Sequence, residues 1–86
     1  MDQCKIGTFL RTLRKEKNLT QEREAEIFNV SRRTVTRWET GMNMPDLATL
    51  VDIADYYGVD IRELFNGERK SEKIYEKFQQ KKGLEY

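Results

Sequence analysis

Residues 20–40 are TQEREAEIFNVSRRTVTRWET, and the alternation of polar caps and apolar residues in this stretch decides the fold. Thr20 carries a side-chain oxygen that can cap a short helix over residues 21–28. Asn29 then tolerates the left-handed backbone of a tight turn, and Ser31 can cap the next helix. Because so brief a connection forces two helices to cross steeply, the stretch predicts a helix-turn-helix.

The second of these helices, expected over residues 31–40, has one apolar side and one polar side. Val35 and Trp38 are three residues apart and form the buried side. The solvent-facing side, with Thr34 at its margin, is expected to hold Arg32, Arg33, Thr34, Thr36 and Arg37. Arginine can pair bidentately with guanine, threonine can contact base edges, and both can hold phosphates. The pattern therefore indicates contacts to base edges in the major groove of double-stranded DNA; on a merely solvated face, Arg33 and Arg37 would repel each other.

Three further helices are expected around this pair. The apolar stripe of a helix over residues 4–17 consists of Ile6, Phe9, Leu10 and Leu13. A cap at Asp46 and a stop at Gly58 bound another helix, whose inward residues are expected to be Leu47, Leu50, Val51, Ala54 and Tyr57. Asp60 and Glu63 form a capping box for a last helix that holds Ile61, Leu64 and Phe65. The expected fold class is all-α, a compact five-helix bundle with a short C-terminal tail.

Composition limits the chemistry that this chain can perform. The 86 residues include no histidine and one cysteine, so an internal disulfide, a Cys/His metal site and histidine-based catalysis are excluded. No phosphate loop or nucleophile–base pair is present in the sequence. We expect neither an enzyme nor a cofactor, and no membrane contact from this segment.

The net charge of +1 is unevenly distributed along the chain. Residues 1–41 hold nine basic and six acidic side chains, residues 42–67 hold one and five, and residues 68–86 hold six and four. A basic first part suits a polyanion such as nucleic acid. We expect residues 1–67 to form the DNA-binding domain, while residues 68–86 form either a solvated linker or a thin helix that contacts a second subunit, a further domain or another protein.

Residues 6–67 resemble the DNA-binding domain of phage Cro and lambda-type repressors, the xenobiotic-response-element family of bacterial regulators. The matching residues are Leu13-Arg14, Leu19-Thr20-Gln21-Glu22, Ala25-Glu26, Val30-Ser31, Thr34-Val35, Arg37-Trp38-Glu39, Gly41, Pro45-Asp46 and Tyr57-Gly58-Val59. The resemblance implies a lambda-repressor-like bundle that binds a pseudo-palindromic operator as a homodimer, in the cytoplasm, and regulates transcription, more often as a repressor. A protein-interaction module of antitoxin or adaptor type, acting through residues 68–86, is the alternative.

The resemblance also implies roles for individual residues. The base-contacting residues are those of the polar side described above. Arg14 and Glu39 are expected to form an ion pair that ties the first helix to the third. The residues expected to hold DNA phosphates are Thr20, Gln21, Ser31, Thr40 and Asn43.

Two points stay open at this level. The family places an apolar residue, usually leucine, at the position of Glu24. There are three alternatives for this carboxylate: the second helix rotates to expose it, Arg23 or another cation pairs with it, or the domain is weakly stable. Glu24→Leu is expected to stabilise the fold, and a drop in melting temperature would show that Glu24 has a native partner. The dimer interface is either the last helix, with Tyr57 and Val59 nearby, or a different surface if these residues complete the core.

Overall fold

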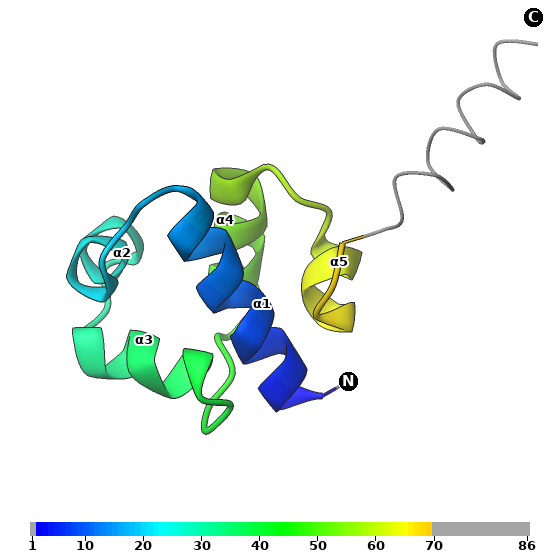
Figure 1. Cartoon of the computed structure of the whole chain (residues 1–86), viewed down its shortest axis with the longest axis horizontal. Helices are drawn as coiled ribbons and strands as arrows, with labels where there is room; N and C mark the ends of the chain where they lie inside the picture. The colour runs from blue at the N-terminus through cyan, green and yellow to red at the C-terminus, as the bar shows by residue number, and fades with distance from the viewer. Residues whose placement is uncertain (1, 70–86) are drawn as a thin grey trace, which may run out of the picture.

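The computed structural model describes residues 2–69, which fold into five helices around one core (Figure 1). The helices are α1 (Gln3–Glu16), α2 (Gln21–Phe28), α3 (Arg32–Glu39), α4 (Leu47–Tyr57) and α5 (Ile61–Asn66). These described residues contain no strand, so the all-α, five-helix prediction is confirmed. None of the helices in this range has the length and hydrophobicity needed to cross a membrane. The expectations for the tail fall almost wholly on residues 70–86, outside the described part.

Side-chain caps define where the helices begin. The Thr20 hydroxyl accepts a hydrogen bond from the Arg23 amide at 3.0 Å, and the Ser31 hydroxyl accepts one from the Thr34 amide at 3.1 Å. Between them Asn29 adopts φ +57°, the left-handed conformation expected for the turn. These local signals fix where α2 and α3 begin, since each cap satisfies an amide that the helix itself leaves unpaired.

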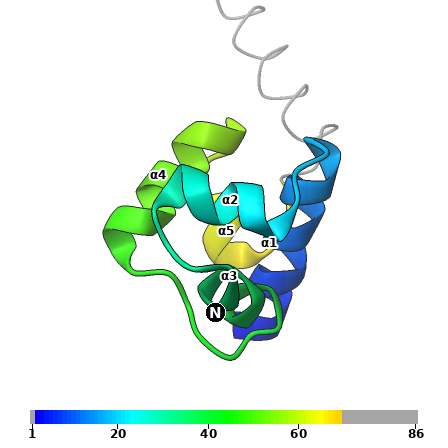
Figure 2. The same cartoon turned by 90° about the vertical axis from the view of Figure 1, so that its left-hand side faces the viewer.

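The core lies where α1 meets the other helices. α1 packs against α3 and α5, and α2 packs against α3 and α4, so every helix contributes to one hydrophobic interior. Figures 1 and 2 both show α3 at the lower edge of the bundle, beside the N-terminal end of α1. The side chains that close the interior are Ile6, Phe9, Leu10, Leu13, Ala25, Val35, Trp38, Leu50, Ile53, Ala54, Tyr57 and Leu64.

The buried side of α4 differs from the sequence prediction. Leu47 is 66% exposed and Val51 is 44% exposed, whereas Ile53, which was not among the expected core residues, is almost completely buried. The helix buries Leu50, Ile53, Ala54 and Tyr57, a regular spacing of three and four residues. The prediction for Leu47 and Val51 was wrong because α4 is apolar around most of its circumference, so that periodicity alone did not fix its rotation.

A close crossing between α1 and α3 depends on Gly7. This residue is buried in α1, and a Cβ atom placed on it would lie 2.8 Å from the Glu39 carbonyl oxygen and closer still to that of Trp38. Such contacts are too short for any side chain. The absence of a side chain at residue 7 therefore lets the backbones of α1 and α3 approach each other.

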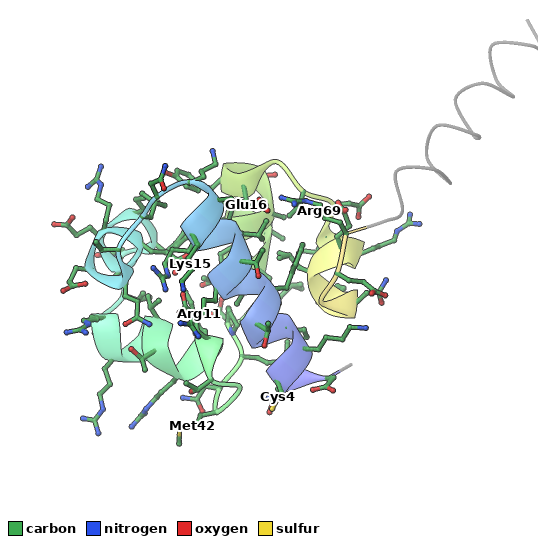
Figure 3. All side chains as sticks on the ribbon, in the orientation of Figure 1. Cys4, Arg11, Lys15, Glu16, Met42 and Arg69 are labelled. Atoms are coloured by element: carbon green, nitrogen blue, oxygen red, sulfur yellow. The ribbon has the colours of Figure 1, made fainter. Side chains whose placement is uncertain are left out.

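The chain leaves α5 along α1. Arg69 forms an ion pair with Glu16, with nitrogen–oxygen distances of 2.5 and 2.9 Å, and Figure 3 shows the two side chains meeting at the end of α1. Lys5 lies 3.5 Å from Glu68 on the same side of the molecule. Both pairs are exposed, so each contributes little to stability, but together they set where the C-terminal segment starts.

Candidate nucleic-acid interface

The outer side of α3 is the polar surface that the sequence predicted. Val35, Trp38 and Glu39 are buried on its inner side. On its outer side Arg32 and Arg33 are exposed, and the half-buried residues are Thr34, Thr36 and Arg37. The ribbon of α3 lies at the edge of the bundle (Figures 1 and 2), in agreement with the exposure of Arg32 and Arg33.

The expected ion pair between Arg14 and Glu39 is present and buried. Arg14 Nε donates to Glu39 Oε2 at 2.6 Å and Nη2 donates to Glu39 Oε1 at 3.1 Å, which is a two-point contact. The hydrogen bond that Arg14 donates to Glu39 raises the pKa of Arg14, so the guanidinium stays charged although burial opposes it. Arg14 Nη1 also donates to the Leu19 carbonyl oxygen at 2.7 Å. One arginine thus connects α1, the loop before α2, and α3.

The ion pair continues into a chain of hydrogen bonds that reaches the outer side of α3. Gln21 Nε2 donates to Glu39 Oε1 at 3.1 Å, and the Thr36 hydroxyl donates to Gln21 Oε1 at 3.1 Å. We call Arg14, Glu39, Gln21 and Thr36 the polar chain. Gln21 was predicted to bind a phosphate, and its link to Thr36 was not predicted. The helix-turn-helix itself could have indicated this link, because in that motif the start of the first helix lies beside the second helix.

The residues expected to hold phosphates differ in whether they have a proton to donate. Phosphate oxygens only accept hydrogen bonds. The Thr20 hydroxyl accepts from an amide and, among the described residues, donates to no acceptor, whereas the Thr40 hydroxyl already donates to the Thr36 carbonyl oxygen at 2.9 Å. Gln21 uses one of its two amide protons on Glu39.

Ser31 and Asn43, the other two expected phosphate contacts, lie at opposite ends of α3. The Ser31 hydroxyl lies 2.9 Å from that of Thr34, and Asn43 is exposed, with its backbone amide donating to the Arg37 carbonyl oxygen at 3.3 Å. With Thr40 beside Asn43, the expected phosphate contacts flank the outer side of α3 at both of its ends. All five stay predictions.

Glu24 is buried and hydrogen-bonded to a residue that sequence analysis did not connect with it. It is 2% exposed, and its Oε1 accepts a hydrogen bond from the Tyr57 hydroxyl. The expectation that α2 rotates to expose Glu24 was wrong, and so was pairing with Arg23, which instead contacts Glu26 at 3.2 Å. The burial of the carboxyl raises the pKa of Glu24; the Tyr57 hydrogen bond opposes this only partly, and the charge of Glu39 adds to it.

The surface of α5 offers little for an interface. Leu64 and Tyr57 are buried in the core, and Val59, Ile61 and Phe65 pack against it while half-buried. The alternative that these residues complete the core is therefore the better description of them. The large apolar side chains that are exposed among residues 2–69 are Met42, Leu47, Val51 and Tyr56.

Comparisons with known proteins agree with this geometry. The profile of the helix-turn-helix family matches residues 10–64. The chain is 44% identical over 59 residues to the HTH-type transcriptional activator BcrR of Enterococcus faecalis, covering 69% of this chain and 29% of BcrR. It is 40% identical over 55 residues to the cryptic phage CTXphi transcriptional repressor RstR of Vibrio cholerae, covering 64% of this chain and 50% of RstR.

A solved structure extends the comparison to three dimensions. The restriction-modification controller protein C.AhdI from Aeromonas hydrophila superposes with a TM-score of 0.66 at 33% identity, covering 73% of this chain and 96% of that protein. The match to C.AhdI is nearly complete, whereas the chain spans half or less of the length of BcrR and RstR.

Proposed function

The chain belongs to the helix-turn-helix family of the Cro and lambda-repressor type, and from this premise we propose that it binds double-stranded DNA at specific sequences and regulates transcription. In this proposal α3 lies in the major groove, the side chains on its outer side contact base edges, and the flanking polar residues hold phosphates. The protein acts by binding and carries out no catalysis.

The outer side of α3 is the observation that carries the proposal. Arg32 and Arg33 are exposed there without a buried partner; the ion pair of Arg32 with Glu22 is long, at 3.8 Å, and exposed on both sides. Such a pair is worth little in water, so a phosphate or a guanine can replace Glu22 at small cost. The polar chain holds α3 in place from the inside, which gives these flexible side chains a fixed base.

We propose that the second copy in a DNA-bound homodimer contacts the exposed apolar side of α4. Leu47 and Val51 are four residues apart and therefore lie on one side of that helix, close to the loop that follows α3. Met42, in this loop, is 70% exposed. A two-fold axis beside this surface brings two copies of α3 to successive turns of one duplex face, about 34 Å apart, which requires a pseudo-palindromic operator.

Repression is the simplest outcome of such binding, because a protein that occupies an operator blocks other proteins from the same DNA. The two curated relatives are named for opposite effects, activation for BcrR and repression for RstR. The proposed binding to operator DNA would place the protein in the cytoplasm. A promoter–reporter fusion carrying the selected operator tests the sign: repression lowers expression when the protein is present.

Selection from random duplex DNA tests the proposed function. The wild-type chain, an Arg32→Ala/Arg37→Ala variant and a control Lys5→Ala/Arg62→Ala variant are compared; the control also removes two positive charges, one from α1 and one from α5. We expect a pseudo-palindromic motif for wild type and control, loss of the motif for the α3 variant, and an affinity that falls steeply with salt.

Different results would overturn the proposal. Weak binding without a motif, unaffected by loss of Arg32 and Arg37, would favour the interaction module that acts through residues 68–86. In that case a chain truncated after Arg69 loses its function although α3 is intact.

A further inference from the structure

The hydroxyl of Thr36 has two hydrogen-bond partners within the protein, and both are acceptors. Its Oγ1 lies 3.1 Å from Gln21 Oε1 and 3.1 Å from the Arg32 carbonyl oxygen. A hydroxyl has one proton and two lone pairs. That proton is therefore used inside the protein, whichever of the two oxygens receives it.

The direction of the Gln21 amide follows from the buried ion pair. A guanidinium only donates and the carboxylate opposite it only accepts, so Glu39 requires a donor from Gln21 as well as from Arg14. The NH2 group of Gln21 must face Glu39, which turns its carbonyl oxygen towards Thr36. Reversing the amide would place two acceptors against each other at Glu39.

We infer that Thr36 reads its base as a hydrogen-bond acceptor, and so selects a base that presents an amino group in the major groove. Adenine offers its N6 amino group and cytosine its N4 amino group there, whereas guanine and thymine offer only acceptors at the corresponding positions. The strand that Thr36 contacts therefore carries adenine or cytosine at that position. This inference rests on the proposed function, since it assumes that α3 lies in the major groove.

Thr34 shows that the constraint is specific to Thr36. Its hydroxyl lies 2.9 Å from the Ser31 hydroxyl, and either oxygen can be the donor. Thr34 can therefore present a proton or a lone pair to DNA. Thr36 differs because both oxygens within reach of its hydroxyl, Gln21 Oε1 and the Arg32 carbonyl oxygen, can only accept.

Base analogues measure the inferred contact directly. Each adenine or cytosine of the selected half-site is replaced in turn by an analogue that lacks only the amino group, and the dissociation constant is measured for the full-length wild type, Thr36→Val and Thr36→Ser. Valine keeps the shape of threonine without the hydroxyl, and serine keeps the hydroxyl. At one position we expect the analogue to weaken binding about 3- to 10-fold for wild type and Thr36→Ser, the range of one hydrogen bond, and to leave Thr36→Val unchanged.

The outcomes separate this inference from the proposed function. The inference is overturned if no amino-group deletion affects wild type more than Thr36→Val. It is also overturned if Thr36→Val changes the preference at a guanine or thymine instead. Both results leave sequence-specific binding intact. Selection that yields no motif overturns the proposed function, and the inference with it. Circular dichroism of Thr36→Val checks that α3 is retained.

Discussion

The Tyr57 hydroxyl donates a hydrogen bond to Oε1 of Glu24 inside the core, and so joins α4 to α2. A neutral hydroxyl, not a cation, is the direct partner of this carboxyl. The hydrogen bond satisfies one oxygen, but it does not replace the water that burial removes, and the pKa of Glu24 is raised. The core therefore contains a group whose charged form is unfavourable.

Stability is expected to depend on pH through Glu24. A carboxyl whose pKa is higher in the folded chain than in the unfolded chain, where it is about 4.3, stabilises the fold fully below that value, and this contribution is lost as the pH rises through the folded pKa. Glu24→Gln, which cannot ionise, is therefore expected to be more stable than wild type at pH 7, with a difference that shrinks towards pH 4. Urea denaturation across this range measures it.

The matched control for this comparison is Glu26→Gln, because Glu26 is an exposed carboxylate on the same helix. Its effect is expected to stay within about 0.5 kcal/mol at every pH. A Glu24→Gln difference that grows in acid would contradict the assigned direction of the shift.

Replacing Glu24 by leucine alone removes the acceptor of the Tyr57 hydroxyl and leaves that hydroxyl buried. The double variant Glu24→Leu/Tyr57→Phe removes both polar groups, so it is expected to be about 1–3 kcal/mol more stable than Glu24→Leu, the cost of one unsatisfied group. Equilibrium unfolding of both variants and of Tyr57→Phe forms a double-mutant cycle. Equal stability of the single and double variants would show that the Tyr57 hydroxyl reaches water when Glu24 is absent.

Glu39→Ala is expected to destabilise the domain by about 3–5 kcal/mol, because it leaves the charge of Arg14 buried without its partner. The midpoint of urea unfolding measures the loss. Glu22→Ala, which removes the exposed carboxylate beside Arg32, serves as the control and is expected to change stability by at most about 1 kcal/mol. Similar values for the two variants would rule out a structural role for the buried pair.

Gly7→Ala is expected to destabilise the fold although alanine favours helices. The intrinsic gain is about 0.5–1 kcal/mol, while overpacking against the backbone of α3 costs about 1–3 kcal/mol. Thermal unfolding gives the net effect, and the difference between Thr8→Gly and Thr8→Ala at the adjacent exposed position gives the helix-propensity part. A melting temperature raised by Gly7→Ala would mean that α1 and α3 can separate at no cost.

Leu47→Lys is expected to weaken binding to an operator with two half-sites while leaving binding to a single half-site unchanged. The added charge disrupts the apolar side of α4 assigned to the second copy, yet it leaves α3 untouched. Gel-shift titrations on both DNA lengths measure the difference. Asp52→Asn changes the net charge by the same single unit on a different side of α4 and is the control; unchanged two-site binding by Leu47→Lys would exclude this interface.

Local chemistry made much of the fold predictable. Caps such as Thr20 and Ser31 and the left-handed Asn29 act within a few residues, so that their effect can be seen in the sequence itself. The rotation of α4 could not be predicted, because it depends on which apolar residues the rest of the bundle covers. Gly7 and the Glu24–Tyr57 contact were missed for the same reason: each is defined by a neighbour far away in the sequence.

The candidate site was predictable to a similar degree. The arginines and threonines of α3 follow from the helical period and from the burial of Val35 and Trp38. The inward hydrogen bonds of Gln21 do not, since they require the distance between the start of α2 and the end of α3. A resemblance to known domains supplied the ion pair of Arg14 and Glu39, but not its extension to the surface.

The polar chain has a consequence for engineering. Its members come from three helices, so the recognition properties of α3 are not encoded by α3 alone. Transplanting residues 32–39 into another scaffold would carry over the arginines proposed to contact bases. The bond of Thr36 to the Arg32 carbonyl oxygen would move with the graft, but its link to the interior would follow only if the recipient also supplied a glutamine at the start of its second helix and an arginine in its first helix to pair with Glu39. A designer who wants to move the whole surface must graft the network, and one who wants to alter it can also start from the buried residues Arg14 and Glu39.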